Sequence, residues 1–217
     1  MLIKNAEVDA GLNPEINVYV PKNKFADFVI SEALKQNVLD RGYEIPTPIQ
    51  DQIIPLILDG RDVVGLARTG TGKTAAFLIP LINQVYNQRD IRVLILAPTR
   101  ELAVQIDSEF KLFAKNLSIY SALCIGGANM NQQISALRRN PQFVIGTPGR
   151  LIDLEKRRIF KFSSFSTIVL DEVDQMFDMG FINDMKYVIE NLPEQRHSLF
   201  FSATLPSKMT EIINSFL

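Results

Sequence analysis

The chain has 217 residues, of which 47% are hydrophobic and 22% charged, and these values suit one domain with a continuous core. A formal net charge of -1 excludes a broadly basic surface, so a nucleic-acid partner has to be argued from local residues. The single cysteine, Cys124, excludes an internal disulfide and lies in an apolar stretch, which predicts a buried strand residue and a reducing compartment. Without a membrane-length apolar run or the pattern of a secretory signal, we expect a cytoplasmic protein with no membrane partner.

The first elements follow an irregular start. Residues 1–24 have no clear period, which predicts an irregular leader before a domain that spans 25–217. A helical pattern near 27–40 comes next. Thr47 and Pro48 then have the residue types of an N-cap and a first helical position, and they predict a second helix.

Apolar runs rich in β-branched residues alternate with segments of helical spacing through the rest of the chain. Continuous apolar strands joined by helices are typical of a parallel sheet that is covered on both faces, so we predict an α/β, doubly wound, mostly parallel sheet flanked by helices. In such sheets ligands bind beyond the carboxyl ends of the strands. The predicted strands are 62–65, 92–97, 119–125, 143–146, 167–170 and 198–201.

A glycine-rich loop lies between the first of these strands and an apolar helix. This order of strand, loop and helix suits a phosphate site, because glycines allow the backbone N–H groups to approach phosphate oxygens and the helix start favours an anion. Lys73 would contact the β- and γ-phosphates, and the Thr74 hydroxyl would bind Mg²⁺. The loop comprises Ala67, Arg68, Thr69, Gly70, Thr71, Gly72, Lys73 and Thr74, with Ala67 where the general pattern has glycine.

Two acids, Asp171 and Glu172, follow the apolar strand 167–170. Asp171 would hold Mg²⁺, and Glu172 would orient or deprotonate an attacking water. Adjacent acids after a strand also occur simply because they favour the start of a helix. Their pairing with a phosphate loop favours the catalytic interpretation.

Together these motifs resemble the DEAD-box ATP-dependent RNA helicases, and the match runs from Phe25 to Thr204. The phosphate loop has the family's own form, including its alanine. The segment 42–50 resembles the adenine-recognising element, which implies that Gln50 bonds a donor and an acceptor of adenine and that Phe25 stacks on the ring. The resemblance implies a RecA-like phosphate-loop NTPase domain that binds ATP and Mg²⁺.

Further residues, each just after a predicted strand, resemble the family's RNA-contacting motifs. Arginines can pair with phosphates, and glycines and helix starts can offer N–H groups to backbone oxygens, contacts that ignore base sequence. Taken singly, each pattern is also an ordinary cap or turn. The RNA residues implied are Pro98, Thr99, Arg100, Gly126, Gly127, Thr147, Pro148, Gly149 and Arg150. Ser202, Ala203 and Thr204 resemble the motif that couples the ATP state to RNA, with Asp174 as its expected hydrogen-bond partner.

The chain departs from the family pattern in two ways. Val173 replaces the alanine of the family's name motif, and we expect it to pack beneath the loop with the chemistry retained. The sequence also ends at Leu217, before the second core domain, which in this family supplies arginines to the γ-phosphate. The implied partners are therefore RNA and a second core domain, and the chain alone should bind nucleotide weakly and hydrolyse it poorly.

Two other functions stay open at this point. A nucleotide-gated RNA clamp would use the same residues with little turnover, and a DNA translocase or another phosphate-loop enzyme would share the phosphate site. Several residues are given no functional role. His197 is interpreted as structural or solvent-facing. The basic residues at 138–139 and 156–158 could touch RNA, but charge runs near helix ends are more often solvated faces. The apolar residues Met176, Phe177, Met179 and Phe181 are expected to pack in the core.

Overall fold

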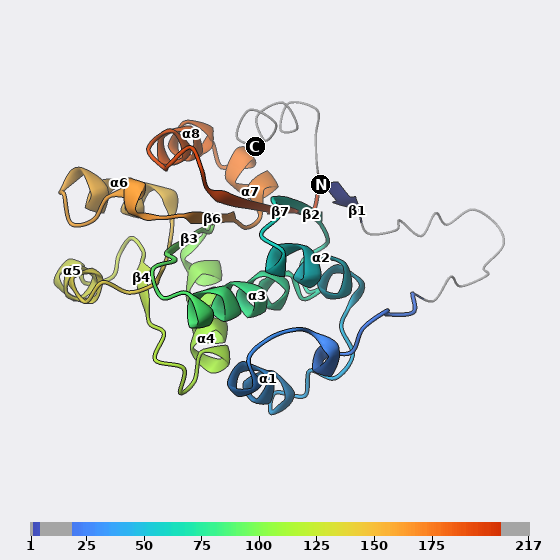
Figure 1. The fold of residues 1–217 in the computed structure, drawn as a ribbon. Helices are drawn as coiled ribbons and strands as arrows, with labels where there is room; N and C mark the ends of the chain where they lie inside the picture. The colour runs from blue at the N-terminus through green and yellow to red at the C-terminus, as the bar shows by residue number, and fades with distance from the viewer. Residues whose placement is uncertain (1, 5–18, 205–217) are drawn as a thin grey trace.

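The computed structural model describes residues 2–4 and 19–204, and Figure 1 shows its ribbon. In these ranges strands alternate with helices along most of the chain. The strands are β1 (Leu2–Lys4), β2 (Val63–Leu66), β3 (Val93–Leu96), β4 (Ser121–Cys124), β5 (Phe143–Gly146), β6 (Thr167–Leu170) and β7 (His197–Ser202). The α-helices are α1 (Glu32–Leu39), α2 (Pro48–Leu58), α3 (Lys73–Asn87), α4 (Arg100–Phe113), α5 (Met130–Arg138), α6 (Pro148–Lys156), α7 (Val173–Asp178) and α8 (Ile182–Glu190). Two 3-10 turns cover Phe25–Asp27 and Phe162–Ser164.

All seven strands belong to one sheet, in the order β1-β2-β7-β6-β3-β5-β4. Every pair of neighbours runs parallel. Parallel strands need a crossover between them, and the helices supply it. The fold is therefore the doubly wound parallel α/β arrangement that the sequence predicts.

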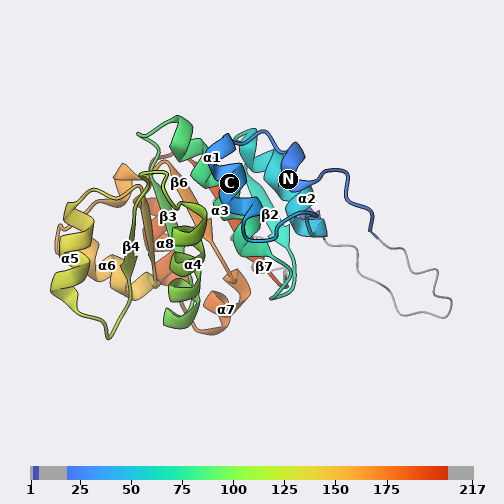
Figure 2. The ribbon, with the colours of Figure 1, turned by 90° about the horizontal axis from the view of Figure 1, so that it is seen from below.

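Helices cover both faces of the sheet (Figures 1 and 2). One core lies between the sheet and α1 to α4, and the other lies between the sheet and α5 to α8. Successive strand residues point to opposite faces, so Val169 joins the first core while Ile168 and Leu170 join the second. Burial on both faces explains why the strands are apolar at nearly every position.

The predicted strands are confirmed to within two residues at their ends. The helix expected near 27–40 is shorter than predicted, because Ser31 caps α1 by accepting a hydrogen bond from Leu34 N (3.4 Å). The expected leader is not wholly irregular: Leu2–Lys4 forms β1, which supplies backbone partners to the otherwise unpaired edge of β2. Residues 5–18 lie outside the described part.

Residues 19–23 are held against α2 by one carboxylate. Asp51, 3% exposed, accepts hydrogen bonds from Tyr19 Oη (2.6 Å), Lys22 N (2.8 Å), Asn23 N (3.1 Å) and Asn23 Nδ2 (2.7 Å). Burial alone would raise the pKa of Asp51, but these hydrogen bonds outweigh it and lower that pKa below its ordinary value. Asp51 thus anchors the chain just ahead of the domain.

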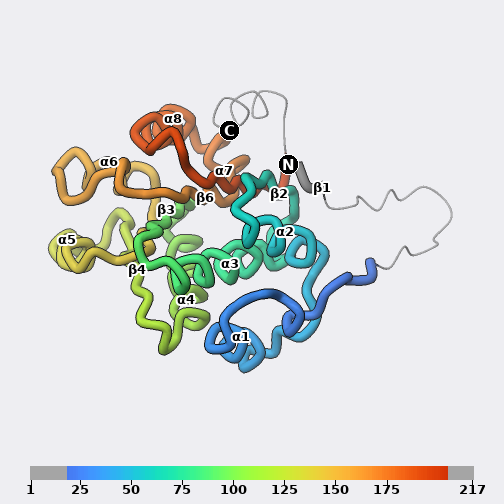
Figure 3. The backbone as a smooth tube through the Cα atoms, in the orientation of Figure 1, coloured from blue at the N-terminus to red at the C-terminus, as the bar shows by residue number. Residues whose placement is uncertain are grey.

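The strand order divides the carboxyl edge of the sheet into two halves. The loops after β2, β7 and β6 are neighbours in one half, and those after β3, β5 and β4 are neighbours in the other. The tube in Figure 3 shows β2 and α5 at opposite ends of the molecule. Across the described residues, no helix combines the length and apolar character that a membrane crossing requires.

Candidate functional site

The phosphate loop connects β2 to α3 at the carboxyl edge of the sheet. Gly70 and Gly72 have φ angles of +83° and +89°, the left-handed region in which a side chain is strained. A Cβ at Gly72 would also collide with the Gln50 amide. Ala67 is 3% exposed, and its N–H donates to Ser202 O (2.9 Å), so the loop begins beside β7. The predicted loop conformation is confirmed.

Lys73, the first residue of α3, is 6% exposed, and its Nζ has no hydrogen-bond partner in the described part of the chain. Asp171, at the end of β6, is 2% exposed. The pKa of Asp171 is raised to about 6. Burial is the largest cause, the positive charge of Lys73 partly offsets it, and the negative charge of Glu172 adds to the rise. A buried cation without a hydrogen bond thus lies beside an acid that resists ionisation. Such a pair forms a site suited to a charged ligand.

Glu172 is held close to the phosphate loop. Its carboxylate Oε1 accepts a hydrogen bond from Thr69 Oγ1 (3.2 Å), although the two residues are 103 positions apart in the chain. Glu172 has φ +51°, an uncommon backbone angle for a residue with a side chain, and it is the N-cap of α7. The loop and the acidic pair that the sequence suggested therefore lie together.

Gln50 lies against the same loop but is already engaged. It is 2% exposed, its Oε1 accepts from Thr47 N (2.9 Å), and its Nε2 donates to Gly72 O (3.1 Å). The first bond belongs to a capping box at the start of α2, a structural role that the sequence analysis missed although the Thr-x-x-Gln spacing signals it. Thr47 Oγ1 adds a hydrogen bond to Thr71 O (2.8 Å).

Phe25, which the resemblance assigns to stacking on adenine, is packed into the core of this structure, and its contact with adenine stays a prediction. Phe25 is 0% exposed and packs edge-on against Phe28 and Tyr43, with ring centroids 5.5 Å and 5.3 Å away. A wholly apolar ring gains most when it leaves water completely, so Phe25 lies in the core and has no free face. Its backbone N–H donates to Glu44 O (3.0 Å), which holds the segment that precedes Gln50.

Asp174 forms the hydrogen bonds expected of it. Its Oδ2 accepts from Ala203 N (3.1 Å), Thr204 N (3.0 Å) and Thr204 Oγ1 (3.2 Å). Ser202 Oγ donates to Thr204 O (2.6 Å) and completes the turn after β7. This turn lies between the phosphate loop and the acidic pair, because β7 lies between β2 and β6.

The residues predicted to contact RNA gather on the other half of the edge. Seven of the nine line an open groove of about 640 Å³ at the starts of α4 and α6, whereas Gly127 and Pro148 are not part of its lining. Thr99 and Thr147 are the N-caps of α4 and α6, so the N-terminal ends of both helices lie at the groove. The groove is lined by Pro98, Thr99, Arg100, Glu101, Gly126, Thr147, Gly149, Arg150, Asp153, Met179 and Phe181.

Arg100 lies directly on Gly126 and Gly127. A Cβ at Gly126 would be 3.1 Å from Arg100 Nη2, and one at Gly127 would be 2.5 Å from Nη1. The two glycines therefore leave space for the guanidinium. Beneath them, Gln133 Nε2 donates to Ile125 O (3.0 Å) from a side chain that is 5% exposed. The sequence analysis missed Gln133, which no local motif marks as part of the groove.

Three residues outside the proposed motifs can now be placed. Met179 is 49% exposed and lines the groove with Phe181, so the expectation that both pack in the core is wrong for Met179. Val173 is 3% exposed and packs in the second core, as predicted. Cys124 is 0% exposed, and burial raises the pKa of its thiol to about 12, which confirms it as a buried strand residue.

Comparison with known proteins identifies the family. The DEAD/DEAH box helicase family model matches residues 47–212. Curated relatives include RNA helicase CrhR of Synechocystis sp., 44% identical over 89% of this chain and 39% of its own length, and ATP-dependent RNA helicase CshA of Listeria monocytogenes, 42% identical over 89% and 38%. The chain thus spans about two fifths of the length of these relatives.

Similar solved structures include a DEAD box protein from Methanococcus jannaschii, with a TM-score of 0.85 and 36% identity over 89% of this chain and 53% of that chain. A hypothetical ATP-dependent RNA helicase from Sulfolobus tokodaii has a TM-score of 0.80 and 35% identity over 87% and 55%. The family model, the relatives and the fold agree with the paired phosphate loop and acids, and the chain belongs to the DEAD/DEAH box helicase family.

Proposed function

We propose that this chain is the ATP-binding core domain of an ATP-dependent RNA helicase, with the domain at 25–217 and a leader before it. The observation that carries this proposal is the contact between the phosphate loop and the acids, made by Thr69 and Glu172 beside the buried Lys73. The RNA groove on the other half of the same edge supports it. One sheet edge can thereby serve a nucleotide and a nucleic acid together.

Triphosphate binding follows from the charges in this site. Lys73 Nζ lacks a hydrogen-bond partner, and phosphate oxygens would supply one. Mg²⁺ also fits, because it prefers hard oxygen ligands and one or two carboxylates together with phosphates; the candidates are Asp171 and the Thr74 hydroxyl. Bound there, Mg²⁺ would neutralise charge that develops on the phosphates. Among the described residues no group of three or more His, Cys, Asp or Glu side chains is placed to hold a metal ion, so phosphate oxygens and waters would complete the coordination.

In this proposal Glu172 orients or deprotonates the water that attacks the γ-phosphate. Its hydrogen bond to Thr69 keeps its carboxylate at the loop before the substrate arrives. Asp174, two residues after Glu172, bonds the turn at 202–204 and so links the acidic segment to the part of the chain that would report the ATP state.

A second core domain is part of the proposal. The chain covers 39% of the length of one curated relative, and the remainder can hold such a domain. An arginine supplied to the transition state of phosphoryl transfer is worth about 10³ to 10⁵ in rate. The isolated chain should therefore bind ATP weakly and turn it over slowly, and RNA unwinding requires both domains. A cytoplasmic location also remains a prediction.

The experiment compares Glu172→Gln with the parent protein in a form that includes the second core domain. ATP and RNA binding should persist, because the amide keeps the size of the side chain, while ATP turnover with RNA present should disappear. Loss of ATP binding would show that Glu172 has another role. Turnover that RNA does not stimulate in the parent protein would favour a nucleotide-gated clamp instead.

A further inference from the structure

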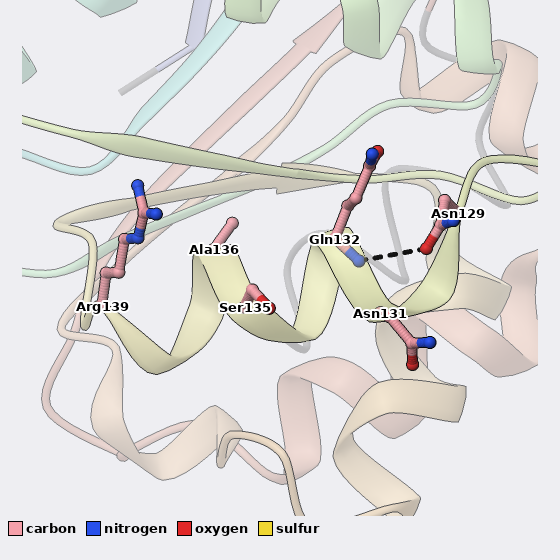
Figure 4. Close-up of a pocket in the computed structure, with 6 residues that line it drawn as sticks. All are labelled: Asn129, Asn131, Gln132, Ser135, Ala136 and Arg139. Atoms are coloured by element: carbon pink, nitrogen blue, oxygen red, sulfur yellow. Dashed lines mark hydrogen bonds between the residues drawn. The ribbon is translucent and has the colours of Figure 1, made fainter.

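Beyond the RNA groove, a second hollow runs along α5 at the β4 end of the sheet. It has a volume of about 430 Å³ and is lined by Asn129, Asn131, Gln132, Ser135, Ala136 and Arg139 (Figure 4). None of the motifs described above includes these residues. Asn129, Gln132, Ala136 and Arg139 follow one another at spacings of three, four and three, so they form one stripe along the helix. The short side chain of Ala136 leaves the hollow between Gln132 and Arg139.

The hollow has the chemistry of a surface that binds nucleic acid. Its lining offers amide and hydroxyl groups, which both donate and accept hydrogen bonds, and one guanidinium. The whole segment 126–142 contains no Asp or Glu and two arginines. A phosphate backbone would therefore meet positive charge here without a competing carboxylate from this segment.

Two side-chain contacts of α5 also connect the hollow to the RNA groove. Gln133, on the inner side of α5, donates to Ile125 O just ahead of Gly126 and Gly127 (3.0 Å). At the start of the helix, Arg150 Nη1 of the groove contacts Met130 Sδ (3.9 Å). Asn129 caps α5 by accepting from Gln132 N (3.2 Å), so the stripe begins at the end of α5 where Met130 contacts Arg150 of the groove.

We propose that the stripe of Asn129, Gln132 and Arg139 is an extension of the RNA site, which binds the sugar-phosphate backbone of the strand where it leaves the groove past Gly126 and Gly127. This inference rests on the proposed function of the groove. RNA fits better than a protein partner because the lining combines amides and a hydroxyl with a cation, and its one apolar side chain is the small Ala136. The extension lengthens the contact with RNA without reading its sequence.

The chain offers a matched control for this proposal. Arg138 and Arg139 are both exposed and carry the same charge, but they project about 100° apart around the helix. Only Arg139 lines the hollow. Arg138→Ala therefore removes the same charge from the same helix without touching the stripe.

The test measures binding of two uridine oligonucleotides to the chain by fluorescence anisotropy at several salt concentrations. One is just long enough for the groove, and the other extends past it. Arg139→Ala and Gln132→Ala should each weaken binding of the longer oligonucleotide by about two- to fivefold and leave the shorter one unchanged. Arg139→Ala should also make the affinity for the longer oligonucleotide less dependent on salt, by the amount expected for the loss of about one phosphate contact. Arg138→Ala should change neither.

Two results would overturn the proposal. Equal losses in Arg138→Ala and Arg139→Ala would mean general electrostatic attraction, and no loss in either would mean that the strand does not follow α5. A parent chain that fails to bind even the shorter oligonucleotide would instead count against the proposed function of the groove.

Discussion

Thr69 Oγ1 donates a 3.2 Å hydrogen bond to Glu172 Oε1 and so joins the phosphate loop after β2 to the acidic pair after β6. These strands are not neighbours, because β7 lies between them. The turn after β7 carries Ala203 and Thr204, whose backbone N–H groups donate to Asp174 of the acidic segment. Three motifs scattered over more than 130 residues of sequence thus form one site.

The raised pKa of Asp171 predicts how stability depends on pH. Its folded-state pKa of about 6 lies above the ordinary value of 3.8 for this side chain, so ionising Asp171 disfavours the folded state. The free-energy cost of ionising Asp171 in the folded state is absent below about pH 4, grows as the pH rises towards 6 and reaches its full size above about pH 6. Asp171→Asn cannot ionise, so its stability relative to the parent should increase by on the order of 2–3 kcal/mol between pH 4 and pH 7. Urea unfolding of both proteins at several pH values measures their difference in stability. A difference that does not change with pH would contradict the prediction.

Asp51 should contribute stability with the opposite pH dependence. Because its folded-state pKa is lowered, the contribution is present above the unfolded pKa and is lost as pH falls through the folded one. Asp51→Asn should cost about 1–3 kcal/mol at neutral pH, since it weakens four hydrogen bonds of a buried carboxylate. Trypsin should then cut faster at Lys22 and Lys24, while Asp40→Asn, at an exposed position, serves as the control. Unchanged cleavage in Asp51→Asn would argue against the anchor.

Gly126→Ala tests whether the glycines make room for Arg100. A Cβ there would meet the guanidinium at 3.1 Å and push it aside. We expect Gly126→Ala to weaken RNA binding about as much as Arg100→Ala does, by a factor of roughly ten, and the double variant to add little. Additive losses in the double variant would mean that Gly126 acts independently of Arg100.

Local patterns predicted the fold and the strand ends at which the phosphate loop and the acidic pair lie. The strands are apolar because both faces are buried, and the phosphate loop and Asp171-Glu172 stand at strand ends, where ligand sites form in such sheets. The exposure of single side chains could not be predicted in the same way. Phe25 and Met179 are both apolar, and only tertiary packing decides that the first has 0% and the second 49% of its surface exposed. Gln133 was missed for the same reason, because its contact with Ile125 depends on how α5 sits on β4.

The central claim is that the phosphate loop and the acids bind ATP, and titration calorimetry of Mg²⁺-ATP into the chain tests it most directly. Lys73→Met should abolish the binding heat, because it removes the buried cation that lacks a partner, whereas Lys115→Met, at an exposed position, should leave it intact. Binding of ATP to Lys73→Met with the affinity of the parent chain would contradict the account.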